Sequence, residues 1–203
     1  LWGAVIIAAC LFLVAQFTVK TAQYDSMVTS AQVADKGSDM ELKPEYTLTN
    51  HHQETVTSSD FHGQWQLVFF GFTSCPEICP TTMGKITSLM NAIGEDSKKI
   101  VPVFISVDPE RDTPEVISEY IKPFHPSMIG LTGTEEQIVA AADAFKAYYS
   151  KMENPSNPDF YMVNHSSFIY LLNPEGISVE IFSYEETLTE IQDRIVHHLN
   201  TLG

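Results

Sequence analysis

The pattern of apolar and polar positions divides the chain into three parts. Residues 1–19 carry no charge and include an apolar run from Ala4 to Ala15, whereas residues 20–44 are polar without a sustained period. From residue 45 onward, apolar segments recur up to the C-terminus. A bilayer core needs about 20 apolar residues in a helix. We therefore expect a transmembrane anchor over 1–19, a linker over 20–44 and a globular domain over 45–203.

Within the expected domain, continuous apolar runs alternate with amphipathic segments. Runs at 66–72 and 100–107 have the composition of strands that are buried on both faces. The expected elements are strands over 45–48, 66–72, 100–107, 129–131, 166–172 and 177–182, and helices over 80–93, 113–122, 135–149 and 185–199. Parallel crossover units followed by an antiparallel hairpin and a helix predict an α/β, thioredoxin-like fold, with a central mixed sheet flanked by helices.

Composition and charge exclude two classes of protein. The chain has 203 residues, with 11 basic against 26 acidic side chains and a formal net charge of −15. A surface this acidic argues against a nucleic-acid partner, because phosphate binding needs clustered Lys and Arg. Three cysteines are too few for a disulfide scaffold.

The N-terminal apolar segment has a second interpretation as a cleaved signal peptide. Residues 7–10 (Ile-Ala-Ala-Cys) resemble a lipoprotein cleavage box, which would make Cys10 a candidate for lipidation. However, the residues after Cys10 stay apolar, where a processed lipoprotein would become polar. This contrast favours an uncleaved transmembrane helix, so the membrane is an expected partner.

Cys75 and Cys79 lie between a buried strand and a helix, where ligands and chemistry gather in parallel α/β sheets. Because Pro80 lacks an N–H group, we expect the regular helix to begin near Pro80, with both sulfurs in the preceding turn. There the helix macrodipole would lower the pKa of a thiol.

A structural disulfide is the simplest alternative for this pair. A loop of about five residues would stabilise the fold by roughly 2 kcal/mol, against about 4.7 kcal/mol for a 100-residue loop, so reactive or metal-binding thiols are favoured. Two thiolates need at least one further ligand to hold Cu(I) or Zn(II), and the chain has seven histidines. On its own, His165 is interpreted as a structural histidine that opens an apolar strand.

Three segments, taken together, resemble the Sco/SenC family. They are 71–82 with both cysteines, 107–114 with Asp108, and 164–171 with the following Pro174-Glu175-Gly176. That family comprises membrane-anchored, thioredoxin-fold copper proteins that help to assemble the dinuclear copper centre of cytochrome c oxidase. The resemblance extends from about Tyr46 to the C-terminus.

The resemblance implies copper, as Cu(I), Cu(II) or both, bound by Cys75, Cys79 and His165, with Asp108 in support. The implied function is a membrane-anchored copper metallochaperone, rather than an enzyme, that delivers copper to the dinuclear centre. Its expected partners are the copper-receiving subunit of cytochrome c oxidase and other periplasmic copper carriers. Its expected location is a bacterial inner membrane with the soluble domain in the periplasm, or alternatively a mitochondrial inner membrane facing the intermembrane space.

A second hypothesis gives Cys75 and Cys79 a catalytic role as a redox-active pair. In this interpretation the protein is a thiol-disulfide oxidoreductase that reduces the cysteines of the copper-receiving subunit, although C-x-x-x-C is not the C-x-x-C spacing of dedicated oxidoreductases. A peroxidase with a resolving cysteine is a third and weaker hypothesis.

Two positions depart from the family pattern. Asn164 precedes His165 where the family has Asp, which affects the basicity of the imidazole and hence copper affinity. The turn Asn50-His51-His52-Gln53 lacks the usual Gly, so we expect an early hairpin of different shape.

Overall fold

The computed structural model describes residues 42–152 and 161–202. The predicted anchor over 1–19 and most of the predicted linker lie outside them. The described elements are β1 (Thr47–Asn50), β2 (Thr55–Thr57), η1 (Ser58–Phe61), β3 (Trp65–Gly71), α2 (Ile78–Ile93), η2 (Gly94–Lys99), β4 (Ile100–Ser106), α3 (Pro114–Ile121), β5 (Ile129–Thr132), α4 (Glu135–Phe145), β6 (Tyr149–Met152), β7 (Met162–His165), β8 (Phe168–Leu172), β9 (Ser178–Ser183) and α5 (Leu188–Leu202). No helix in this part of the chain is both long and apolar enough to cross a bilayer.

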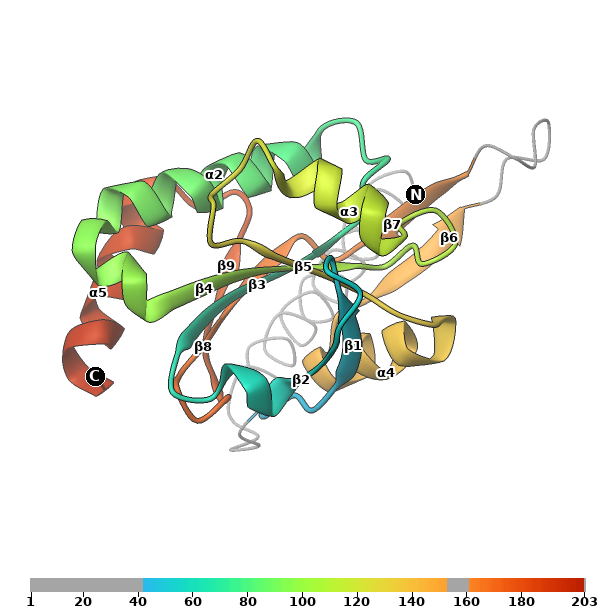
Figure 1. Cartoon of the computed structure of the whole chain (residues 1–203). Coiled ribbons are helices and arrows are strands. Elements are labelled where there is room, and N and C mark those ends of the chain that lie inside the picture. The colour runs from blue at the N-terminus through green and yellow to red at the C-terminus, as the bar shows by residue number, and fades with distance from the viewer. Residues whose placement is uncertain (1–41, 153–160, 203) are drawn as a thin grey trace, which may run out of the picture. The chain divides into compact units, whose positions relative to one another are not determined.

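Seven strands form one mixed sheet in the order β2-β1-β5-β4-β3-β8-β9. The three central strands, β5, β4 and β3, run parallel, and every other pairing is antiparallel. Helices α2, α3 and α5 lie along one face of the sheet and α4 lies on the other (Figure 1). The thioredoxin-like α/β fold with a central mixed sheet, predicted from the order of elements, is confirmed.

Aromatic side chains fill both layers between the helices and the sheet. On one face, Phe69 packs on Phe104, whose ring contacts Tyr120 of α3. On the other face, Phe145 of α4 packs edge-on against Phe70 and also contacts Tyr170 of β8. Successive side chains of β3 thus enter opposite layers, which explains why its sequence is apolar at nearly every position.

The starts of α3 and α4 are confirmed, because each has the threonine cap that the sequence indicates. The hydroxyl oxygens of Thr113 and Thr134 accept hydrogen bonds from the main chain of the first helical turn. The predicted end of α4 at residue 149 is wrong. The helix ends at Phe145 because Lys146 adopts the left-handed conformation, with φ 56°, and its N–H bonds back to carbonyls of the last turn.

The early hairpin turns at Asn50–Gln53, the segment in which the sequence lacks the usual glycine. β1 begins at Thr47 rather than at residue 45, and it pairs with β2, which the sequence pattern did not reveal. Gln53 takes a positive φ of 67°, a conformation that glycine adopts more easily. The side-chain oxygen of Asn50 accepts hydrogen bonds from the main-chain N–H groups of His52 and Glu54 and so supports the turn.

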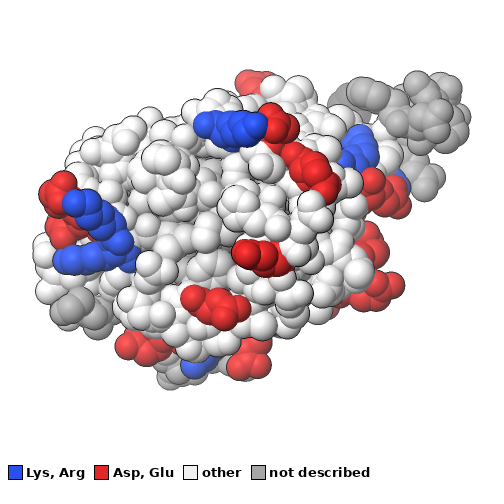
Figure 2. All heavy atoms as spheres, in the orientation of Figure 1, with Lys and Arg blue, Asp and Glu red and all other residues white. Residues whose placement is uncertain are grey.

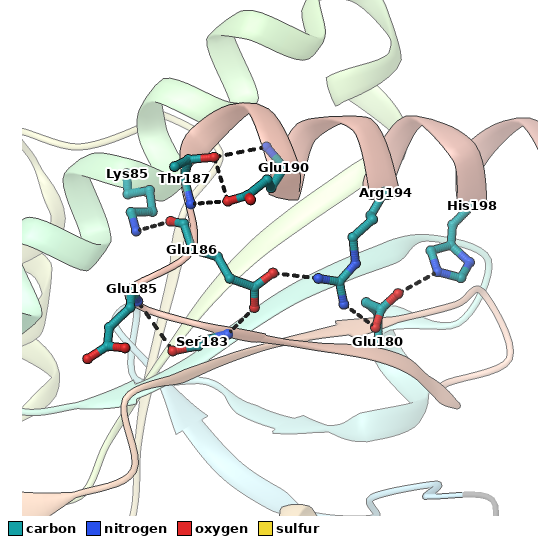
Figure 3. Close-up of polar contacts among 9 residues, drawn as sticks. All are labelled: Lys85, Glu180, Ser183, Glu185, Glu186, Thr187, Glu190, Arg194 and His198. Atoms are coloured by element: carbon teal, nitrogen blue, oxygen red, sulfur yellow. Dashed lines mark hydrogen bonds and ion pairs between the residues drawn. The ribbon is translucent and has the colours of Figure 1, made fainter.

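Polar contacts attach α5 to strand β9, and the turn before α5 to α2 (Figure 3). Arg194 pairs with Glu180 of β9 and with Glu186 in the preceding turn, and His198 lies 3.2 Å from Glu180. Lys85 of α2 donates to main-chain carbonyls of this turn, including that of Glu186. These contacts fix the C-terminal helix on the same layer as the helix that carries Cys79.

Charged side chains are scattered over the face shown in Figure 2, with wide uncharged areas between them. Several lysines pair with acids three residues away along a helix, as Lys98 does with Glu95 and Lys122 with Glu119. This face therefore has no continuous basic patch of the kind that binds a phosphate backbone.

Candidate metal centre

Cys79 is buried against the end of β3 because Gly71 leaves room for it. A Cβ atom added to Gly71 would lie 2.9 Å from the Cys79 sulfur and 2.9 Å from a ring carbon of Phe104. Helix α2 begins at Ile78, so Cys79 lies in its first turn, and the prediction that both sulfurs precede the helix is wrong for this residue. Pro80 is tolerated there because the first N–H groups of a helix have no partner within the helix.

Cys75 lies in the turn before α2, as predicted, and is half-buried. Its Sγ atom accepts a hydrogen bond from the main-chain N–H of Cys79 at 3.4 Å. Burial raises the pKa of the Cys79 thiol, whereas the sequence predicted a lowered value. Loss of water around the buried sulfur outweighs the stabilisation that the helix N-terminus offers to a thiolate.

His165 reaches the two cysteines from another part of the chain. It is the last residue of β7, and not the first residue of an apolar strand as predicted, and its Nε2 atom lies 3.4 Å from the Sγ of Cys79. Its Nδ1 atom lies 2.9 Å from the carbonyl oxygen of Ser166. Because a carbonyl can only accept, Nδ1 carries the proton and the lone pair of Nε2 faces the sulfur.

Burial lowers the pKa of His165, which favours the neutral imidazole that metals require. The rings of Phe69 and Phe72 approach the imidazole, with centroids at 6.0 and 5.8 Å and interplanar angles of 72° and 89°. These contacts restrict the ring and leave only the Nε2 side directed at the sulfurs.

The potential ligand atoms of Cys75, Cys79 and His165 all lie within 4.8 Å of one another. Among residues 42–152 and 161–202, this is the one group of three such side chains close enough to share a metal ion. Two sulfurs and one imidazole nitrogen are donors that suit Cu(I), and Zn(II) accepts the same donor types. The residues therefore fit a soft metal ion.

Asp108, predicted to support the site, lies outside this group. It is buried at 3% exposure and bonds to Arg111 and to the hydroxyl of Tyr161. Sequence reasoning missed Asp112, which is fully buried and accepts hydrogen bonds from both the N–H and the hydroxyl of Thr73, two residues before Cys75. The only signal was its place in the same acidic segment as Asp108.

Comparison with known proteins identifies the family. The sequence model of the SCO1/SenC family matches residues 34–200, which is well over half of the chain. The chain belongs to the SCO1/SenC family.

Individual SCO proteins match about three quarters of the chain. The SCO2-like protein of Rickettsia prowazekii is 43% identical over 148 residues, which cover 73% of this chain and 72% of that protein. The mitochondrial SCO1 homolog of Homo sapiens is 38% identical over 156 residues, covering 76% of this chain and 52% of the human protein.

Two solved SCO structures with bound copper have the same fold. ScoI of Arabidopsis thaliana, solved with copper bound, has 38% identity and a TM-score of 0.73, covering 78% of this chain and 98% of that chain. Yeast Sco1 with copper bound has 33% identity and a TM-score of 0.74, covering 79% of this chain and 90% of that chain.

Proposed function

We propose that this SCO1/SenC protein is a copper metallochaperone in which Cys75, Cys79 and His165 bind copper as cargo. The observation that carries the proposal is the convergence of two sulfurs and one imidazole within 4.8 Å. The copper-bound Arabidopsis and yeast relatives support the choice of copper over zinc. Three soft donors suit three-coordinate Cu(I) and leave a position free for a ligand of the receiving protein.

Access to the site favours transfer of the metal. An open hollow of about 260 Å³ is lined by residues that include Cys75, His165 and Met162. Cys79 is fully buried, whereas Cys75 and His165 are partly exposed. An incoming ligand can therefore reach the metal from the side of Cys75 and His165, while Cys79 holds it from the interior.

Copper binding is coupled to the release of protons. Burial keeps the Cys79 thiol protonated in the metal-free protein, since its pKa is raised. Binding of Cu(I) by the Cys79 thiolate displaces the proton of that thiol. The cation replaces the water that burial removed and so stabilises the buried thiolate.

The proposal extends to anchoring and delivery. In it, residues 1–19 form a transmembrane helix, residues 20–44 a linker, and residues 45–203 the copper-binding domain, which delivers copper to the dinuclear centre of cytochrome c oxidase. A short tether raises the effective concentration of the site for an acceptor in the same membrane. Rickettsial and mitochondrial relatives support the two expected locations, the bacterial inner membrane facing the periplasm and the mitochondrial inner membrane.

Titration of the reduced protein with Cu(I) against a chromophoric competitor tests the ligand set. We expect one Cu(I) per chain and a loss of affinity of at least about tenfold in His165→Ala, because a first ligand contributes at least as much as its supporting partners. His197→Ala is the matched control, since His197 is an exposed imidazole on α5. Equal affinity of His165→Ala and wild type would refute the ligand set.

The proximity of the two sulfurs also supports a second candidate, the thiol-disulfide oxidoreductase with Cys75 and Cys79 as its redox pair. The two Sγ atoms lie within 4.8 Å of each other, and an oxidised pair cannot bind copper. However, the protonated Cys79 thiol is a poor nucleophile in the metal-free protein. Negligible turnover with a dithiol reductant and a disulfide substrate, beside tight Cu(I) binding, would exclude this function.

A further inference from the structure

The strand that ends at His165 belongs to a small sheet of its own. In the described part of the chain β7 pairs only with β6, and Tyr149 lies opposite His165 in this register. Figure 1 shows the two strands as a ribbon that extends beside the seven-stranded sheet. The large sheet holds His165 only through Ser166 and Ser167, which join it to β8, so side-chain contacts of the ribbon can contribute to the position of the imidazole.

Tyr161, four residues before His165, links the ribbon to the body of the protein. Its hydroxyl donates a hydrogen bond of 2.6 Å to Oδ1 of Asp108, which lies in the loop after β4. Both residues are buried, with 7% and 3% exposure. A short bond to a buried carboxylate is among the stronger hydrogen bonds in proteins and restricts both partners.

Arg111 and Lys151 hold the same tyrosine at further points. The Nε of Arg111 donates to Oδ2 of Asp108 at 2.5 Å, and its Nη1 donates to the carbonyl of Tyr161 at 3.1 Å. The guanidinium carbon lies 3.7 Å from the centre of the Tyr161 ring, and Nζ of Lys151 lies 3.9 Å from it. The hydroxyl, the ring and the main-chain carbonyl of Tyr161 are thus each held by a separate contact.

The loop that holds Tyr161 also holds the cysteine segment. Asp112, four residues after Asp108, accepts hydrogen bonds from the N–H of Thr73 at 2.9 Å and from its hydroxyl at 2.5 Å. It also accepts one from the hydroxyl of Ser106 at 2.6 Å. One short loop therefore contacts both segments that supply the metal centre. Asp112 contacts the segment that carries the cysteines, and Asp108 contacts the ribbon that carries His165.

We propose that Tyr161 is a positioning residue. Through its contact with Asp108, it holds the imidazole of His165 close enough to the two sulfurs for all three groups to bind one metal ion. The inference rests on the proposed copper site. Tyr161→Phe keeps the ring and its stacking but removes the hydroxyl contact. The affinity that His165 contributes to copper should then fall, while the two thiolates should bind as before.

A double-mutant cycle on the reduced protein tests this, with Cu(I) as the probe in a competition titration. The variants are Tyr161→Phe, His165→Ala and the double replacement, with Tyr148→Phe as the control. Tyr148 lies just before the same ribbon, is 61% exposed, and its hydroxyl makes no hydrogen bond to a described residue. We expect Tyr161→Phe to lower Cu(I) affinity about tenfold in the wild-type background and not at all in His165→Ala. Tyr148→Phe should match the wild type.

Other outcomes would overturn either the positioning role of Tyr161 or the proposed copper site. Wild-type affinity in Tyr161→Phe would overturn the positioning role, and so would an equal loss in both backgrounds, because that indicates a general structural effect. Wild-type affinity in His165→Ala would instead overturn the proposed copper site. If Tyr161→Phe does not fold, Asp108→Asn enters the same cycle, since it keeps an oxygen acceptor for the Tyr161 hydroxyl but removes the charge that strengthens this bond, and the same outcomes decide.

Discussion

Replacement of Gly71 by alanine should destabilise the fold and disturb the metal centre, because the added methyl group would collide with the Cys79 sulfur. The added Cβ would meet the Cys79 sulfur and Phe104 Cε2, each at 2.9 Å, and Phe69 Cε1 at 3.0 Å. These three side chains are at most 1% exposed, so none can move into solvent. Overpacking of a dense core costs about 1–3 kcal/mol. We expect Gly71→Ala to lower the free energy of unfolding by that amount and to displace the Cys79 sulfur.

Gly84→Ala is the matched control. Gly84 lies in the middle of α2, the helix that carries Cys79, and an added Cβ there would meet no atom within 4 Å. Alanine in a helix interior is more stable than glycine by roughly 0.5–1 kcal/mol. The same chemical change, made in the helix that carries Cys79 instead of in strand β3, should therefore have the opposite sign.

Thermal unfolding of the reduced metal-free protein and Cu(I) competition together measure both effects. A change of 1 kcal/mol moves the midpoint by about 2–4 °C in a domain of this size. Gly71→Ala should melt several degrees below the wild type and bind Cu(I) more weakly, whereas Gly84→Ala should melt slightly higher with unchanged affinity. Wild-type stability and affinity in Gly71→Ala would refute the packing argument.

Three further predictions concern the scaffold. Asp112→Asn places an amide opposite the donors of Thr73 and should lower stability by about 1–3 kcal/mol in urea unfolding; an unchanged midpoint would contradict this. Burial alone would raise the pKa of Glu180, but hydrogen bonds led by that from Arg194 outweigh it and lower the pKa. This carboxylate therefore stabilises the fold above its unfolded pKa of about 4.3 and stops doing so as the pH falls through the folded pKa. Glu180→Gln should thus be less stable than wild type at pH 7, with a difference that shrinks in acid; a constant difference would count against it. Thr134→Ala removes a helix cap and should cost about 1 kcal/mol in thermal unfolding, and an unaltered melting point would argue that the cap is redundant.

Local signals in the sequence were sufficient to predict the helices and six of the seven strands of the main sheet, all but β2. The unbroken apolar runs at β3 and β4 indicated strands covered on both faces, and the threonines before α3 and α4 marked the starts of those helices. The position of Cys75 and Cys79 after β3 likewise follows from strand and helix periods alone.

The β6–β7 ribbon could not be predicted in the same way. The predicted helix over 135–149 overlapped the first residue of β6, because nothing in the sequence marks Lys146 as left-handed. The pairing of β6 with β7 is a tertiary contact, so His165 could be placed beside the cysteines only through the family resemblance. The roles of Tyr161 and Asp112 depend on side chains that meet across the fold.

The most direct test of the central claim is X-ray absorption spectroscopy of the reduced protein loaded with one equivalent of Cu(I). We expect two sulfur scatterers and one imidazole nitrogen around the metal, and loss of the imidazole signal in His165→Ala but not in His197→Ala. A copper ion without an imidazole neighbour in the wild type, or one whose spectrum is the same in His165→Ala, would contradict the account.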